Sequence, residues 1–159
     1  MIYLIRHADA VPGDPDEARP LSAEGRRQVR RLASFVQRCR GDEFAPAEIW
    51  HSPLRRAEET AARLAKRAGW KANLRTVEGL QPDDDPSIIA GRLEVTDLPV
   101  ALVGHNPHLT LLATLLVVGR ASPPVFLVRK CAFIALEPAR GRGRGCWVVD
   151  CHIVPQWMA

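Results

Sequence analysis

The segment IYLIRHADA (residues 2–10) places an arginine and a histidine directly after a short apolar run. Residues 2–5 favour β-structure and are followed by charged side chains, a pattern that predicts a buried strand. Arg6 and His7 then follow the carboxyl end of that strand. Ligands of open α/β sheets bind at this edge, so the pair is the first candidate for a functional site.

The rest of the chain alternates between further strand and helix patterns. Short apolar runs at 48–50, 100–103, 132–136 and 147–149 predict strands, and a short helix is predicted over about 86–94. Apolar residues at helical spacing indicate three longer helices. Ser22 caps the first helix and the second ends near Gly69. Their apolar residues are, in chain order, Val29, Leu32, Ala33 and Val36; Ala57, Ala61, Leu64, Ala65 and Ala68; and Leu109, Leu112, Ala113 and Leu116. This order predicts an α/β fold in three layers, with a mainly parallel sheet between helices and a final hairpin.

Length and composition narrow the class of protein. A chain of 159 residues with 47% hydrophobic and 25% charged residues is expected to form one domain over residues 1–159. It contains no apolar stretch of the roughly 20 residues that a membrane helix needs, so a soluble, cytoplasmic protein without a membrane partner is expected. The formal charge of +4 favours anionic ligands. The four cysteines form no C-x-x-C pair and are interpreted as reduced thiols: Cys39, Cys131, Cys146 and Cys151.

A second histidine follows a later strand in the segment ALVGHNP (residues 101–107). Asn106 is predicted to cap the next helix and Pro107 to occupy its first turn. His105 would then lie at a helix entrance, where backbone amides attract anions. Because His7 also follows a strand, we expect the two imidazoles to lie close together.

Two arginines occur in HSPLRRAEET (residues 51–60), again directly after a predicted strand. Ser52 and Pro53 open a helix, and Arg55 and Arg56 fall in its first turn. Guanidinium groups match phosphate oxygens in a bidentate way and stay charged at any working pH. At least one of the two arginines is therefore expected to face an anion pocket.

Four segments resemble, in the same order, the motifs of the histidine phosphatase superfamily, also called phosphoglycerate mutase-like: RHADA, RPLSAEGRRQ, SPLRRAEET and VGHNP. The resemblance spans about residues 2–110, and within the superfamily it is most similar to the SixA-type phosphohistidine phosphatases. It implies the phosphoglycerate mutase-like fold. Only 48 residues separate His7 from Arg56, and 48 separate Arg56 from His105, so no large lid insertion is expected. Ala8 stands where the wider superfamily usually carries glycine.

The resemblance also implies roles for individual residues. His7 is the nucleophile that forms a covalent phosphohistidine, and His105 is the second histidine of the pocket. Arg6 and Arg56 bind the phosphoryl group; the spacing of SP-x-x-RA selects Arg56 rather than Arg55. Two further residues are weaker candidates for substrate binding: Arg19 and Asn106.

The chemistry of the residues agrees with these roles. A neutral imidazole nitrogen attacks phosphorus when the other ring nitrogen is held as a donor, for example to a backbone carbonyl. Arginines and a second histidine stabilise the transferred phosphoryl group without a metal or cofactor. No metal is expected at the H-x-x-H pair of His105 and His108, since it straddles Pro107, nor at His51 or His152, which have no obvious partners.

Two further classes are weighed against an enzyme. A non-catalytic phosphate- or phosphoprotein-binding module would have kept the pocket and lost turnover, yet both arginines and both histidines of the motifs are present. The segment ARGRGRG (residues 139–145) hints at nucleic acid, but it is short, has no interleaved aromatic residues and fits a hairpin turn. Neither reading is preferred, and no nucleic-acid partner is expected.

The expected substrate depends on whether the site contains a general acid. Mutase-like relatives place a general-acid carboxylate in the region where this chain has Gln81. The nearby carboxylates leave open which of them, or whether any, serves as the acid: Glu78, Asp83, Asp84 and Asp85. An imidazole leaving group needs far less help than an alkoxide. The sequence therefore predicts hydrolysis of phosphohistidine on a signalling protein, such as a phosphotransfer domain; the alternative is a small phosphate ester.

Overall fold

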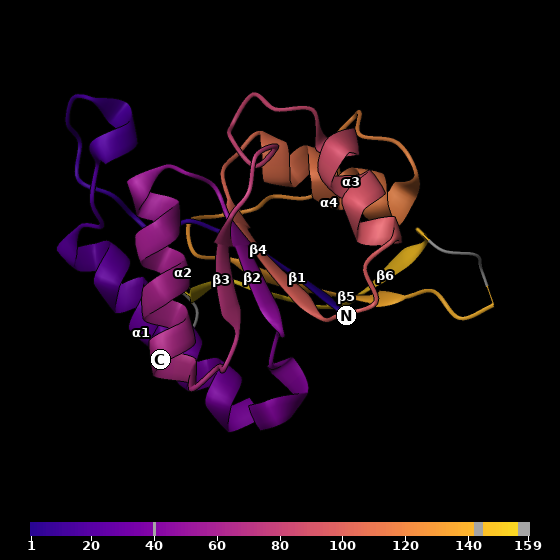
Figure 1. Cartoon of the computed structure of the whole chain (residues 1–159), viewed down its shortest axis with the longest axis horizontal. Coiled ribbons are helices and arrows are strands. Elements are labelled where there is room, and N and C mark those ends of the chain that lie inside the picture. Colours follow the sequence, from indigo (N-terminus) through magenta and orange to yellow (C-terminus); the bar gives the residue numbers. More distant parts are fainter. Residues whose placement is uncertain (40, 142–144, 156–159) are drawn as a thin grey trace.

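The computed structural model describes residues 1–39, 41–141 and 145–155 and is built on a six-stranded sheet (Figure 1). The strand order is β3-β2-β4-β1-β5-β6, in which β3, β2, β4 and β1 are parallel and β5 is antiparallel to both of its neighbours. This mixed, mainly parallel sheet agrees with the prediction. The strands are β1 (Ile2–Arg6), β2 (Glu48–His51), β3 (Asn73–Thr76), β4 (Val100–Gly104), β5 (Phe133–Pro138) and β6 (Trp147–Ile153).

Helices cover both faces of the sheet, which confirms the three layers. Figure 1 shows α1 and α2 on one side and α3 and α4 on the other. None of the helices in the described part of the chain is long and apolar enough to cross a membrane. The helices are α1 (Ala23–Cys39), α2 (Arg55–Ala68), α3 (Pro86–Glu94) and α4 (His108–Val118), with short 3₁₀ turns η1 (Asp16–Ala18) and η2 (Gly41–Phe44).

The alternation of side chains along β1 explains why both faces must be covered. Tyr3 and Ile5 are buried in one hydrophobic cluster with the apolar stripes of α1 and α2. Ile2 and Leu4 are buried in the other cluster, with α3 and α4. A strand whose successive side chains all need burial is stable only between two layers of helices.

Two elements at the sheet edges test the sequence-based prediction. The final hairpin is confirmed, because β5 and β6 pair antiparallel; residues 142–144 of the predicted turn lie outside the described residues. The strand β3 was missed. All four of its side chains are exposed, so it lacks the apolar run on which the prediction depended.

The pairing of β1 with β4 brings the two strand ends together. Arg6 lies opposite Gly104, so His7 and His105 follow at the same edge of the sheet. The His7 amide donates to the Gly104 carbonyl at 2.9 Å. The helix after β1 packs on one face and the helix after β4 on the other, which is the arrangement that opens a binding crevice.

Candidate active site

His7 is held in one orientation and one tautomer. Its Nδ1 lies 2.7 Å from the Ala8 carbonyl oxygen. A carbonyl only accepts hydrogen bonds, so Nδ1 carries the proton and Nε2 keeps its lone pair in the neutral ring. This contact confirms the predicted backbone acceptor. The backbone is fixed as well, since the amide of Cys131 donates to the carbonyls of Arg6 and His7.

The environment of His7 keeps its ring uncharged. Burial lowers the pKa of His7 to about 4; the hydrogen bond to Ala8 raises it, and the positive charges of Arg56, Arg6 and Lys130 lower it. The side chain is therefore neutral near pH 7, with an unprotonated Nε2. A nucleophile needs this state.

His105 lies against His7, as expected from the strand ends. The ring centroids are 4.9 Å apart and the ring planes are inclined by 47°. His105 is buried, and its Nε2 lies 2.8 Å from the Ser52 hydroxyl. Burial lowers its pKa to about 3, with further lowering by His7 and Arg56. Ser52 was assigned only to the start of a helix, so its contact with His105 was missed.

We expect both histidines to remain uncharged when the pH falls from 7.5 to 5.5. With pKa values of about 4 for His7 and about 3 for His105, less than about a tenth of either ring is protonated at pH 5.5. An ordinary imidazole with a pKa near 6.5 is about nine-tenths protonated there. The measurement is an NMR titration of the Cε1–H resonances, assigned with the two alanine variants. Titration of both rings near pH 6.5 would contradict the described burial and charges.

Arg56 enters the site from the first turn of α2, and it is buried. The carbonyl of Arg56 accepts from the Thr60 hydroxyl, and that hydroxyl oxygen accepts from the Ala8 amide at 3.0 Å, which links α2 to the residue after His7. Arg55 points elsewhere: it pairs with Glu59 at 3.0 Å on the exposed side of the helix. The structure thus places Arg56, and not Arg55, beside the two histidines.

Asp16 in η1 binds Arg56 and was missed by the sequence analysis. Arg56 Nη1 donates to the Asp16 carbonyl at 2.8 Å, and Nη2 donates to its carboxylate at 3.0 Å. The same carboxylate accepts from Arg19 at 2.6 Å. Hydrogen bonds from Arg19 and Arg56 lower the pKa of Asp16, so it is ionised at neutral pH. Arg19, predicted to bind substrate, thus contacts the pocket through Asp16.

The carbonyl of Val128 joins two other predicted site residues. Arg6 Nη1 donates to it at 3.1 Å, and Asn106 Nδ2 donates to it at 2.9 Å. The predicted helix cap at Asn106 is wrong: Pro107 is the N-cap of α4 and no side chain caps that helix. The Asn106 amide instead ties the start of α4 to the segment before β5.

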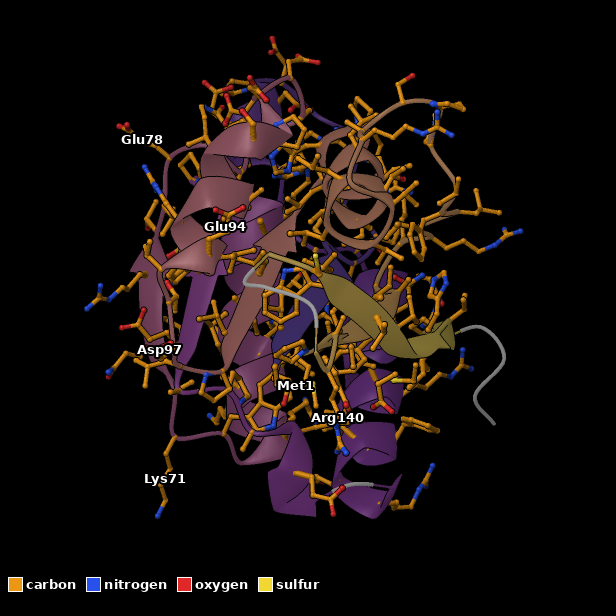
Figure 2. All side chains as sticks on the ribbon, turned by 90° about the vertical axis from the view of Figure 1, so that its right-hand side faces the viewer. Met1, Lys71, Glu78, Glu94, Asp97 and Arg140 are labelled. Carbon is orange, nitrogen blue, oxygen red and sulfur yellow. The ribbon has the colours of Figure 1, made fainter. Side chains whose placement is uncertain are left out.

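The candidate general acids lie in the segment between β3 and α3. Asp84 accepts from the Gln81 amide at 2.8 Å, and Asp85 caps α3 by accepting from Ser87 at 2.9 Å. Glu78 points away from the body of the protein (Figure 2). Asp83 is exposed. Asp84 and Asp85 thus stabilise their own loop, and no contact of these carboxylates with His7 is seen in the described residues.

The H-x-x-H pair is separated by the fold. His105 faces His7, whereas His108 is fully buried at the start of α4. Within residues 1–39, 41–141 and 145–155, no three His, Cys, Asp or Glu side chains are grouped so that they could hold a metal ion.

Comparisons with known proteins agree with this arrangement. A sequence model of the histidine phosphatase superfamily (branch 1) matches residues 2–82, whereas no curated protein matches the chain significantly. The structure of the protein histidine phosphatase SixA complexed with tungstate gives a TM-score of 0.82 at 22% identity, covering 98% of this chain and 97% of that chain. A protein assigned as SixA from Agrobacterium tumefaciens gives 0.76 at 21% identity, covering 97% of each chain. A mycobacterial glucosyl-3-phosphoglycerate phosphatase gives 0.65 at 17% identity, covering 94% of this chain and 96% of that chain.

Proposed function

The chain belongs to branch 1 of the histidine phosphatase superfamily, and from this premise we propose that it hydrolyses phosphohistidine on a protein. The observation that carries the proposal is the neutral His7, held by the Ala8 carbonyl with Nε2 free to attack. Arg6, Arg56 and His105 surround it with groups that bind a phosphoryl group. A phosphotransfer domain is the kind of protein that carries such a substrate.

The reaction proceeds in two displacements. In the first, His7 Nε2 forms a bond to phosphorus while the bond from phosphorus to the substrate imidazole breaks. The departing imidazole leaves as a neutral molecule when its second ring nitrogen carries a proton. In the second, water attacks the phosphoryl group on His7, releasing inorganic phosphate and regenerating the neutral ring.

Each basic side chain has a separate task in these steps. Arg56 and Arg6 stabilise the negative charge on the three phosphoryl oxygens, which is the main demand of a loose transition state. Asp16 holds the Arg56 guanidinium before substrate binds, so the incoming phosphoryl oxygens must share or replace that contact. Arg19 keeps Asp16 in place. Ser52 orients the His105 ring through Nε2, and this nitrogen donates to a phosphoryl oxygen when the substrate replaces that contact, because Nδ1 is buried.

Two features favour a phosphohistidine over a phosphate ester. The chain matches SixA over 98% of its own length and 97% of the SixA chain, and the 48-residue spacings from His7 to Arg56 and from Arg56 to His105 leave little room for a lid, which favours access by a protein surface. The carboxylates of the β3–α3 segment are exposed or bonded within their loop, which leaves no evident acid to protonate an alkoxide. The small-ester alternative is supported by the shared fold of the mycobacterial sugar-phosphate phosphatase.

Side-by-side hydrolysis separates the two functions. The enzyme is given a histidine-phosphorylated phosphotransfer domain, phosphoramidate, phosphoserine and a sugar phosphate, and phosphate release is measured for each. The proposal expects kcat/KM to be highest for the phosphorylated domain. Faster turnover of the sugar phosphate than of every phosphohistidine substrate would establish the ester function instead.

Single amide substitutions in the β3–α3 segment are expected to leave phosphoramidate hydrolysis within about tenfold of the wild-type rate. A positioned general acid contributes about 10² to 10⁴-fold, so a smaller loss excludes that role in the hydrolysis of phosphoramidate. The variants are Glu78→Gln, Asp83→Asn, Asp84→Asn and Asp85→Asn, with thermal unfolding recorded for each because Asp85 caps α3. Collapse of activity in a variant that remains folded would identify the missing acid.

A further inference from the structure

A second basic cavity lies next to the proposed phosphoryl site. Its volume is about 370 Å³, and it is lined by Arg6, Gln28, Arg129 and Lys130. Arg6 belongs to both places, so whatever occupies the cavity lies beside the phosphoryl group. No acidic side chain is among its lining residues.

The cations of this cavity are fixed to the catalytic strand through Cys131. Its amide donates to the carbonyls of Arg6 and His7 at 3.0 and 3.2 Å. Its φ of 56° is unusual for a residue other than glycine, and its thiol is fully buried, so surrounding contacts hold this turn in place. The backbone of Arg129 and Lys130 is therefore held in a defined position relative to His7.

The charges in the cavity are only partly compensated. Lys130 pairs with Asp9 at 2.5 Å, whereas the exposed Arg129 guanidinium makes no hydrogen bond or ion pair with the described part of the chain. The side-chain carbonyl oxygen of Gln28 accepts a hydrogen bond from the Asp9 amide, which leaves the NH₂ group of Gln28 as a donor. The net charge that an incoming anion meets is about +2, from the three cations Arg6, Arg129 and Lys130 and the one carboxylate of Asp9.

The same segment also presents apolar side chains to the solvent. Val125 is 60% exposed and Leu127 is 67% exposed, four and two residues before Arg129. A small substrate bound in the cavity would leave these side chains in water. A protein bound there would cover them and also reach the guanidinium.

We propose that this cavity is a subsite for a carboxylate side chain of the substrate protein, next to its phosphohistidine. The inference rests on the proposed function and deepens it by assigning a sequence preference to the substrate. Arg129 binds the carboxylate in a bidentate way, and Lys130 and Gln28 complete the set of donors. Phosphohistidine that has an acidic neighbour on the correct side is then the preferred substrate.

The test uses phosphohistidine peptides in which a single Glu is placed, in turn, at each position within four residues of the phosphohistidine. The full-length enzyme is expected to prefer one Glu position about tenfold in kcat/KM over the matching Gln peptide, mainly through KM. Arg129→Glu is expected to remove that preference and to favour Lys at the same position. For the preferred peptide the loss in kcat/KM is expected to exceed the loss for phosphoramidate at least tenfold.

Arg140→Glu is the matched control for the charge reversal. Arg140 follows the end of β5, where Leu136 pairs with Ile2 at the start of β1. It therefore lies at the opposite end of β1 from Arg6, and Figure 2 shows it near Met1. This variant is expected to keep the wild-type preference. The subsite would be overturned if the wild type preferred no Glu position. It would also be overturned if Arg129→Glu lowered kcat/KM equally for the peptide and for phosphoramidate.

Two other outcomes separate this inference from the proposed function. A wild-type enzyme that hydrolyses none of the phosphohistidine peptides or the phosphorylated domain overturns the proposed function itself. The second outcome compares hydrolysis of phosphoserine with that of the preferred peptide, with p-nitrophenyl phosphate as a reference substrate that has no carboxylate. If Arg129→Glu lowers kcat/KM for phosphoserine more than for the peptide, the cavity binds a small substrate and the docking role is overturned.

Discussion

Replacing His7 with alanine is expected to abolish phosphatase activity, with a loss of about 10⁴-fold or more in kcat. The variant lacks the neutral ring that holds an unprotonated Nε2 at the end of β1, beside Arg6 and Arg56. Removing a nucleophile eliminates the two-step route, and only the slow direct attack of water on the bound substrate remains. The phosphoenzyme should disappear as well. It is detected in the wild type as acid-labile, alkali-stable phosphate on the protein after rapid mixing with labelled phosphoramidate.

His152→Ala provides the control for this prediction. His152 is an exposed histidine on β6, two strands from β1 in the sheet, with its ring beside Phe126, so its loss should leave both turnover and phosphoenzyme near wild-type levels. Circular dichroism of His7→Ala would establish that the sheet is intact. Labelled phosphate found on a residue other than His7 in the wild type would refute the mechanism.

The sequence predicted the centre of the site because the centre is built from strand ends. Apolar runs of four or five residues fix where β1 and β4 end, and parallel pairing then places the next residues at one edge. His7 and His105 follow directly from this rule. Arg56 was selected over Arg55 by the resemblance of SP-x-x-RA, and the structure agrees, since Arg56 is buried on α2 together with Ala57, Ala61 and Leu64.

The parts that were missed depend on contacts between distant segments. Asp16 lies in a polar stretch without periodicity, and only the path of residues 11–20 brings it to Arg56, 40 residues later. Lys130 meets Asp9 across 121 residues. No local pattern marks either pair. β3 was missed for a different reason: at the sheet edge its stability comes from pairing with β2, which its exposed side chains do not reveal.

Arg56→Ala is expected to lower kcat/KM on the order of 10³-fold, the second largest loss at this site. An arginine that stabilises a transferred phosphoryl group contributes about 10³ to 10⁵-fold. Truncation also leaves the Asp16 carboxylate paired with Arg19 alone, so its negative charge is less well compensated beside the bound phosphoryl group. Adding Asp16→Asn to Arg56→Ala should therefore recover part of the lost activity. Steady-state kinetics with phosphoramidate measures both effects.

Arg55→Ala is the natural control, because it removes the same group one residue away. Neighbouring helical residues point about 100° apart. The Arg55 guanidinium pairs with Glu59 at the surface, and the Arg55 side chain is 54% exposed. Its loss should change kcat/KM less than about threefold. Equal losses for the two variants would mean that α2 is rotated about its axis in the working enzyme, and that the phosphoryl group is bound by a different face of the helix.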